Sequence, residues 1–323
     1  MKKLVSMLVM IVMLTGVFAA CGNAPAASGK KIQIVTTIFP EYDWVKSIVG
    51  DSENVEITML LDNGVDLHSF QPTAQDIVKV SSCDMFIYVG GESDKWVDDV
   101  LKEAVNDKMV VMDLFDVLGE SLKEEEEIEG MQSEEEEEGE GEEEVEYDEH
   151  IWLSLRNAQL LIKKIAEEII KIDPANKSKY EANLESYIGS LTELDAKYKE
   201  AADGGRVKTL LFGDRFPFRY MTDDYGLDYY AAFKGCSAET EASFDTVIFL
   251  ANKVDELGLH SVLTIEGGDK SIAKTIVQNT ADKNAVILTL DSMQGKTSAD
   301  VANGATYLSI MEKNLEVLRN ALA

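Results

Sequence analysis

The chain is poor in histidine, in cysteine and in positive charge. Its 323 residues include only three histidines and three cysteines, and 60 acidic residues stand against 30 basic ones. Three cysteines cannot build a disulfide framework. A net charge of −30 disfavours nucleic acid as a partner, because binding a phosphate backbone requires a basic surface. With so few histidines, the position of each one is informative.

Catalytic signatures are also missing. The sequence contains no H-E-x-x-H pair and no G-x-S-x-G turn. A metallohydrolase would need a metal with an open coordination position and a placed general base. We therefore expect a binding protein rather than an enzyme, with a metallohydrolase as the less favoured alternative.

Only one long apolar run is present, from Leu4 to Phe18, and it is short for a membrane span. It follows two lysines and precedes Ala19, Ala20 and Cys21, which is the layout of a secretory signal peptide over residues 1–20. The segment 17–22 is similar to a bacterial lipobox, with Phe18 where leucine is usual. This predicts lipidation of Cys21, a small-residue tether over 21–30 and an extracytoplasmic protein anchored to the cell membrane. An ordinary signal peptide with a nearby cysteine is the alternative.

The negative charge is concentrated in one segment. Residues 119–150 hold 18 acidic residues and one basic residue, Lys123, and so contribute −17 of the total charge. Such a segment cannot bury enough apolar surface to offset its ordering entropy, which predicts a disordered acidic insertion over 119–147. It is either a solvated insertion or a weak collector of cations, since carboxylates suit hard ions.

Two sets of alternating strand and helix patterns flank this segment and a helical region. The first predicts an N-terminal lobe over 31–150, with strands near 32–36, 55–61, 84–89 and 109–112. The second predicts a C-terminal lobe over 204–323, with strands near 207–212, 228–233, 261–266 and 285–290 and a last helix over 301–322. Alternation of this kind indicates parallel sheets covered by helices. The fold class is therefore α/β, with two Rossmann-like lobes.

The region between the lobes, residues 151–203, is helical and is broken near Asp173 and Pro174. After the break, apolar residues from Tyr180 to Tyr198 recur at helical spacing. About 27 helical residues would span roughly 40 Å, enough to reach both lobes. We expect one long linker helix that limits hinge motion.

Two of the three histidines lie where a ligand would bind. His68 follows the second predicted strand, at the carboxyl end where open α/β sheets bind ligands. His150 follows the acidic segment and precedes a helix that Ser154 can cap. His260 precedes a strand, away from that edge, and is expected on the surface.

Three motifs carry a resemblance over nearly the whole chain: HSFQPT at 68–73, DEHIWLS at 148–154 after a charged loop, and the closing segment 305–314. With the anchored N-terminus and the single linker helix, the chain resembles the ZnuA/TroA-like substrate-binding lipoproteins of zinc and manganese ABC transporters. The resemblance implies that His68 and His150 each give one imidazole to a metal ion held between the lobes. It also implies delivery by a monomer to a transporter permease and its ATPase.

The remaining ligands do not follow the family pattern. Gly213 stands where the family places its third ligand, and the fourth position falls in a loop with Asp291 and Gln294. We expect substitutes among three carboxylates in loops that face the cleft: Asp214, Glu241 and Glu266.

The choice of metal stays open between zinc and manganese. Carboxylates in place of a histidine ligand favour manganese. The charged loop before His150 is instead typical of the zinc branch of the family, and we expect zinc. No thiolate is assigned to the site, which argues against copper(I). A surface adhesin remains an alternative role.

Overall fold

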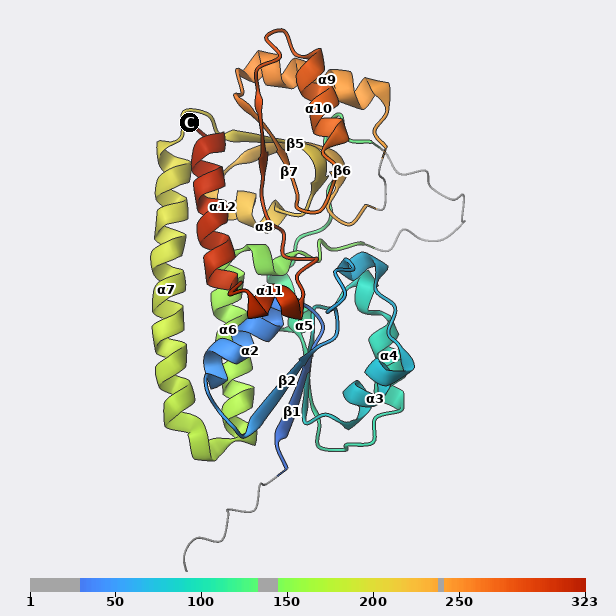
Figure 1. Cartoon of the computed structure of the whole chain (residues 1–323), viewed down its shortest axis with the longest axis vertical. Coiled ribbons are helices and arrows are strands. Elements are labelled where there is room, and N and C mark those ends of the chain that lie inside the picture. The colour runs from blue at the N-terminus through green and yellow to red at the C-terminus, as the bar shows by residue number, and fades with distance from the viewer. Residues whose placement is uncertain (1–29, 133–144, 238–240) are drawn as a thin grey trace, which may run out of the picture.

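The computed structural model describes residues 30–132, 145–237 and 241–323. It has two lobes, each built on a four-stranded parallel sheet (Figure 1). The strands of the first lobe are β1 (Ile32–Thr36), β2 (Val55–Met59), β3 (Met85–Tyr88) and β4 (Val110–Asp113). Those of the second are β5 (Thr209–Phe216), β6 (Asp228–Lys234), β7 (Ser261–Thr264) and β8 (Val286–Thr289). The spatial orders β2-β1-β3-β4 and β6-β5-β7-β8 repeat one topology, so the predicted fold class is confirmed.

Helices connect the parallel strands in both lobes, as a parallel sheet requires. In the first lobe they are α2 (Phe39–Val49), α3 (Ala74–Ser82) and α4 (Trp96–Lys102), while α5 (Leu114–Leu118) and α6 (Leu155–Ile172) follow the last strand, β4. In the second they are α8 (Arg219–Tyr225), α9 (Phe244–Leu257) and α10 (Ser271–Asn279). Short 3-10 turns at η1 (Leu67–Ser69), η2 (Glu92–Asp94) and η4 (Ile151–Leu153) follow β2, follow β3 and precede α6.

The linker is α7 (Lys177–Gly204), which runs along both lobes in Figure 1. Its 28 residues correspond to about 42 Å of helix. Near its start, Asn183 Nδ2 donates to the carbonyl of Ile48 in the first lobe (2.9 Å). Near its end, the Tyr198 hydroxyl donates to the carbonyl of Met311 (2.7 Å). The helix is therefore fastened to the structure at both ends.

The C-terminal region departs from the prediction of one helix over 301–322. The structure has α11 (Ser298–Ala302) and α12 (Tyr307–Ala321) instead. Gly304 lies between them with φ of +92°, a left-handed conformation that ends the first helix. Thr306 then begins the second, because its hydroxyl accepts from the Ser309 backbone N–H. Helical periodicity alone does not register such a local break.

Both ends of segment 119–147, predicted as a disordered insertion, are hydrogen-bonded to the rest of the structure. The backbone N–H of Glu125 donates to the carbonyl of Glu146 (2.8 Å), and that of Gln132 donates to the carbonyl of Ala232 in the second lobe (2.8 Å). Met131 is buried, so the few apolar residues of the segment hold its flanks against the protein. Residues 133–144 lie outside the described part of the chain, as do the predicted signal peptide and Cys21.

Cys83 and Cys236 are both free thiols. Cys83 is buried at the end of α3, just before β3. Across residues 30–132, 145–237 and 241–323, no helix has the length and apolar character needed to cross a bilayer.

Candidate metal centre

His68 lies in η1, at the carboxyl end of the first sheet. The Asp66 side chain caps this turn by accepting from the His68 backbone N–H (2.9 Å). The imidazole Nδ1 is 3.0 Å from Ser93 Oγ and 3.1 Å from Glu149 Oε2. A proton on Nδ1 is therefore directed to Glu149, which leaves the Nε2 lone pair for a ligand.

His150 is fully buried and immediately precedes η4. Asp148 Oδ1 accepts from the His150 backbone N–H (2.8 Å) and lies 3.0 Å from its Nδ1. Asp148 is itself buried, and its backbone carbonyl accepts from the Tyr220 hydroxyl of the second lobe (2.9 Å). These contacts hold the ring in one orientation, in which Nε2 points away from Asp148.

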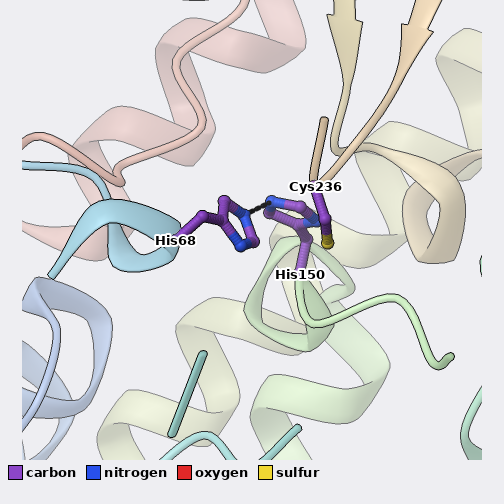
Figure 2. Close-up of side chains that lie close together, drawn as sticks. All are labelled: His68, His150 and Cys236. Atoms are coloured by element: carbon purple, nitrogen blue, oxygen red, sulfur yellow. Dashed lines mark hydrogen bonds between the residues drawn. The ribbon is translucent and has the colours of Figure 1, made fainter. Parts of the chain in front are cut away.

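The two Nε2 atoms face each other at 3.2 Å, although the residues are 82 positions apart (Figure 2). Two nitrogens bound to one tetrahedral zinc ion, each at 2.0–2.1 Å, lie about 3.3 Å apart. Each ring also has its other nitrogen next to a carboxylate, the arrangement that orients metal-bound histidines. The pair has the spacing and the support of two ligands of one metal ion.

The site is electronegative. Burial would lower the pKa of His150, but the negative charge and hydrogen bond of Asp148 outweigh it, and the pKa lies above its ordinary value. Burial would raise the pKa of Glu149, but hydrogen bonds from His68 and Ser93 lower it overall. The pKa of Asp66 is lowered in the same way: burial opposes the shift, while His68 and Arg215 favour it. Carboxylates held in their ionised form attract a cation to the imidazoles.

A third potential ligand comes from the second lobe. Cys236 lies just after β6, and its thiol falls within 4.8 Å of the ligand nitrogens of His68 and His150 (Figure 2). Burial first, and then the carboxylates of Glu125 and Asp148, raise the pKa of this thiol well above its ordinary value. The sequence analysis gave Cys236 no role. Its position at the carboxyl end of a parallel strand was the signal that could have identified it.

The three predicted carboxylates are not part of this cluster. Asp214 Oδ1 and Oδ2 accept from the backbone N–H groups of Arg215 (2.9 Å) and Ile265 (3.2 Å). Glu266 accepts from the backbone N–H and the hydroxyl of Ser292 (2.6 and 2.9 Å). Glu241 is exposed. All three line a cavity of about 810 Å³ between the lobes. The hydrogen bonds of Asp214 and Glu266 are made with residues of their own lobe.

Gly213 leaves no room for a ligand side chain. A Cβ there would lie 2.6 Å from the Cα of Ala273 in α10, which packs directly on β5. The position at which the resemblance implies a third ligand is thus filled by helix packing.

Gln294 reaches the cluster from the loop after β8. With its amide nitrogen turned to Asp66 Oδ1 (3.1 Å), its oxygen accepts from His150 Nε2 (3.3 Å). Asp291, by contrast, pairs with Lys296 (2.6 Å). His260 is exposed, as predicted.

Comparison with known proteins places this geometry in a family. The profile of the family described as zinc-uptake complex component A, periplasmic, matches residues 34–321. The chain belongs to this family.

Curated relatives agree. The high-affinity zinc uptake system protein ZnuA of Bacillus subtilis is 30% identical over 311 residues, 94% of this chain and 93% of that protein. The zinc-binding protein AdcA of Streptococcus pyogenes is 29% identical over 293 residues, 90% of this chain. The chain spans only 56% of the length of that AdcA. The AdcA of Streptococcus pneumoniae, 30% identical over 301 residues, is named a zinc-binding lipoprotein.

Solved structures share the fold. The Zn(II)-bound ZnuA-like domain of Streptococcus pneumoniae AdcA aligns with a TM-score of 0.69 at 25% identity, over 90% of this chain and 99% of that one. The metal-dependent lipoprotein YcdH of Bacillus subtilis aligns with a TM-score of 0.72 at 27% identity, over 91% and 100%. A laminin-binding adhesin of Streptococcus agalactiae aligns at 23% identity, which is a likeness of fold alone.

Proposed function

We propose that the protein captures a zinc ion between its lobes and delivers it to the permease of an ABC transporter. The observation that carries this proposal is the 3.2 Å separation of His68 Nε2 and His150 Nε2, with a carboxylate beside each Nδ1. The ionised carboxylates around the pair favour a cation, and the names of the relatives specify zinc.

Zinc is favoured over manganese by the donor set. Imidazole nitrogen suits zinc, whereas manganese prefers carboxylate, carbonyl and water oxygens. The carboxylates that motivated manganese, Asp214 and Glu266, accept hydrogen bonds from their own lobe. We therefore propose zinc as the cargo and expect manganese to bind more weakly.

The test is calorimetric titration of zinc into three histidine variants. His68→Ala and His150→Ala should each weaken binding by more than the 10–100-fold that loss of an outer hydrogen-bond partner costs. His260→Ala is the matched control, because that histidine is exposed, and it should bind as the wild type does. Wild-type affinity in both site variants would overturn the proposal.

A second readout is thermal stability. A ligand that binds only the folded protein adds about 2.7 kcal/mol at a hundredfold excess over its Kd. Zinc should therefore raise the Tm of the wild type and of His260→Ala. The same addition should leave the Tm of His68→Ala nearly unchanged.

We also propose that Cys21 is lipidated and holds the protein at the outer face of the cell membrane. The lipobox-like segment 17–22 and the lipoprotein name of the pneumococcal relative support this. Cys21→Ala should release the protein from the membrane fraction and abolish labelling by a fatty acid. Retention of the label in that variant would refute the assignment.

A further inference from the structure

The imidazole pair belongs entirely to the first lobe and the segment that follows it. Two nitrogens do not complete a zinc site, which takes four donors in a tetrahedron. Asp66 Oδ1 of the first lobe lies 3.9 Å from His68 Nε2, but the other oxygen of that carboxylate is held by Arg215. Further donors can come from the side of the pair that faces the second lobe. A second-lobe residue that binds the ion would link the two lobes through the metal.

Arg215 does not supply a donor. It lies at the end of β5, and its guanidinium Nη2 is 2.7 Å from Asp66 Oδ2 of the first lobe. A guanidinium has no lone pair to give to a metal and stays protonated. Its part is to tie the lobes together beside the site.

Cys236 has the right chemistry and the right position. Within the described ranges, its Sγ and the two imidazoles form the one cluster of histidine, cysteine and acidic side chains with all ligand atoms within 4.8 Å. A zinc–sulfur bond of about 2.3 Å would put the sulfur about 3.6 Å from each zinc-bound nitrogen. Figure 2 shows the thiol beside His150, on the side of that ring away from His68, so the end of β6 has to shift toward the Nε2 pair when the ion binds.

The backbone on the N-terminal side of Cys236 lies close to the His150 ring. A Cβ on the preceding Gly235 would lie 3.1 Å from His150 Cε1 and Nδ1 and 2.9 Å from the Phe216 carbonyl. The absence of a side chain there lets the end of β6 reach the imidazole. The Cys236 backbone N–H then donates to Glu125 Oε1 (2.9 Å), which fixes the residue next to the site.

We infer that the Cys236 thiolate is the third protein ligand of the zinc ion. Through this ligand the second lobe binds the ion. On binding, the thiol gives its proton to solvent and a zinc–sulfur bond forms. The fourth position is left to water or the Gln294 amide oxygen, and an incompletely enclosed ion can be released. A thiolate also raises the preference for zinc over manganese, because it is a soft donor.

This inference rests on the proposed zinc capture, and X-ray absorption separates the two. In the zinc-loaded full chain, the zinc edge should show one sulfur neighbour at about 2.3 Å beside nitrogen and oxygen neighbours. With cobalt(II) in place of zinc, a thiolate-to-cobalt charge-transfer band should appear. Both signals should vanish in Cys236→Ser and persist in Cys83→Ser, the matched control, because Cys83 is a buried cysteine at the end of α3.

Affinity gives the second measurement. Cys236→Ser should lose at least about tenfold in zinc affinity and less in manganese affinity. Its metal-free Tm should match that of the wild type, which separates ligand loss from misfolding. Tight zinc binding with only nitrogen and oxygen neighbours would overturn the role of Cys236 and leave the proposed function standing. Failure of the wild type to bind zinc would overturn both.

Discussion

The two lobes have the same strand order, yet the carboxylates at their facing edges do different work. In the first lobe, Asp148 and Glu149 point at imidazole nitrogens and hold two histidines in one orientation. In the second, Glu266 accepts from the backbone N–H and hydroxyl of Ser292, much as Glu149 accepts from those of Ser93, and Asp214 accepts from backbone N–H groups. A repeated topology therefore fixes where a site can form, and the presence of an imidazole beside the carboxylate distinguishes the first lobe from the second.

Among changes that compare the two lobes, the largest effect is expected at their carboxylates. Glu149→Gln removes the negative charge beside His68 Nδ1, and Asp148→Asn does the same for His150. Either change should weaken zinc binding roughly 10–100-fold, as loss of such a partner does. Glu266→Gln, in the second lobe, should cost less than the lower of those limits. If calorimetry found equal losses of zinc affinity in Glu149→Gln and Glu266→Gln, the proposed difference between the two lobes would be wrong.

The next effect is on pH dependence. Zinc needs a neutral imidazole, and the pKa of His150 lies above its ordinary value in the metal-free protein. Affinity should therefore be full above that raised pKa and should begin to fall while the pH is still above about 6.5, the ordinary value for histidine. Asp148→Asn removes the main charge that raises the pKa, so the fall should move to lower pH. A pH profile from 8 to 5.5 that is the same in both proteins would contradict this.

Two glycines offer a stability test that contrasts the linker with the second lobe. A Cβ at Gly189, exposed in α7, would meet no atom within 4 Å, whereas one at Gly213 would lie 2.6 Å from the Ala273 Cα. Gly189→Ala should stabilise the protein by about 0.5–1 kcal/mol, since alanine favours a helix interior. Gly213→Ala should destabilise it, because β5 and α10 must separate. Denaturant unfolding measures both, and a stable Gly213→Ala protein would refute the packing argument.

A smaller effect is expected at the ion pair between the lobes. Arg215→Gln removes the contact with Asp66, and both side chains are about a fifth exposed. Solvent-accessible pairs contribute roughly 0.2–1 kcal/mol, so the metal-free Tm should fall only slightly. A loss of Tm well beyond what that range predicts would show that this pair contributes strongly to holding the lobes together.

The smallest effect on the main site is expected from the acidic segment. Residues 133–144 carry nine glutamates, and their replacement by glutamine leaves the packed flanks unchanged. The high-affinity zinc site should be unaffected. If the segment collects cations, the wild type should bind additional metal ions weakly and in a salt-sensitive way, because exposed carboxylates bind through screened charge. The glutamine variant should not bind these additional ions. Equal stoichiometry in both proteins would leave only a solvated insertion.

Local pattern was sufficient for most elements of the fold. The β-branched run at Ile32–Thr36 and the helical spacing after Pro174 depend on neighbours in sequence, and both elements formed where expected. His68 and His150 could be selected because histidine is rare here and both follow recognisable motifs. The break between α11 and α12 was missed because it depends on the conformation of Gly304 and the cap at Thr306.

The sequence by itself determined two α/β lobes, one linker helix and two histidines as candidate ligands, because these follow from periodicity, rarity and short motifs. Only the tertiary structure decided what surrounds the imidazoles. It brought Cys236 next to residues 86 and 168 positions earlier in the chain, and it turned Asp214 and Glu266 toward their own backbone. Such contacts depend on how two lobes dock and on which hydrogen bonds each carboxylate has already made, and neither is encoded in any local stretch of sequence.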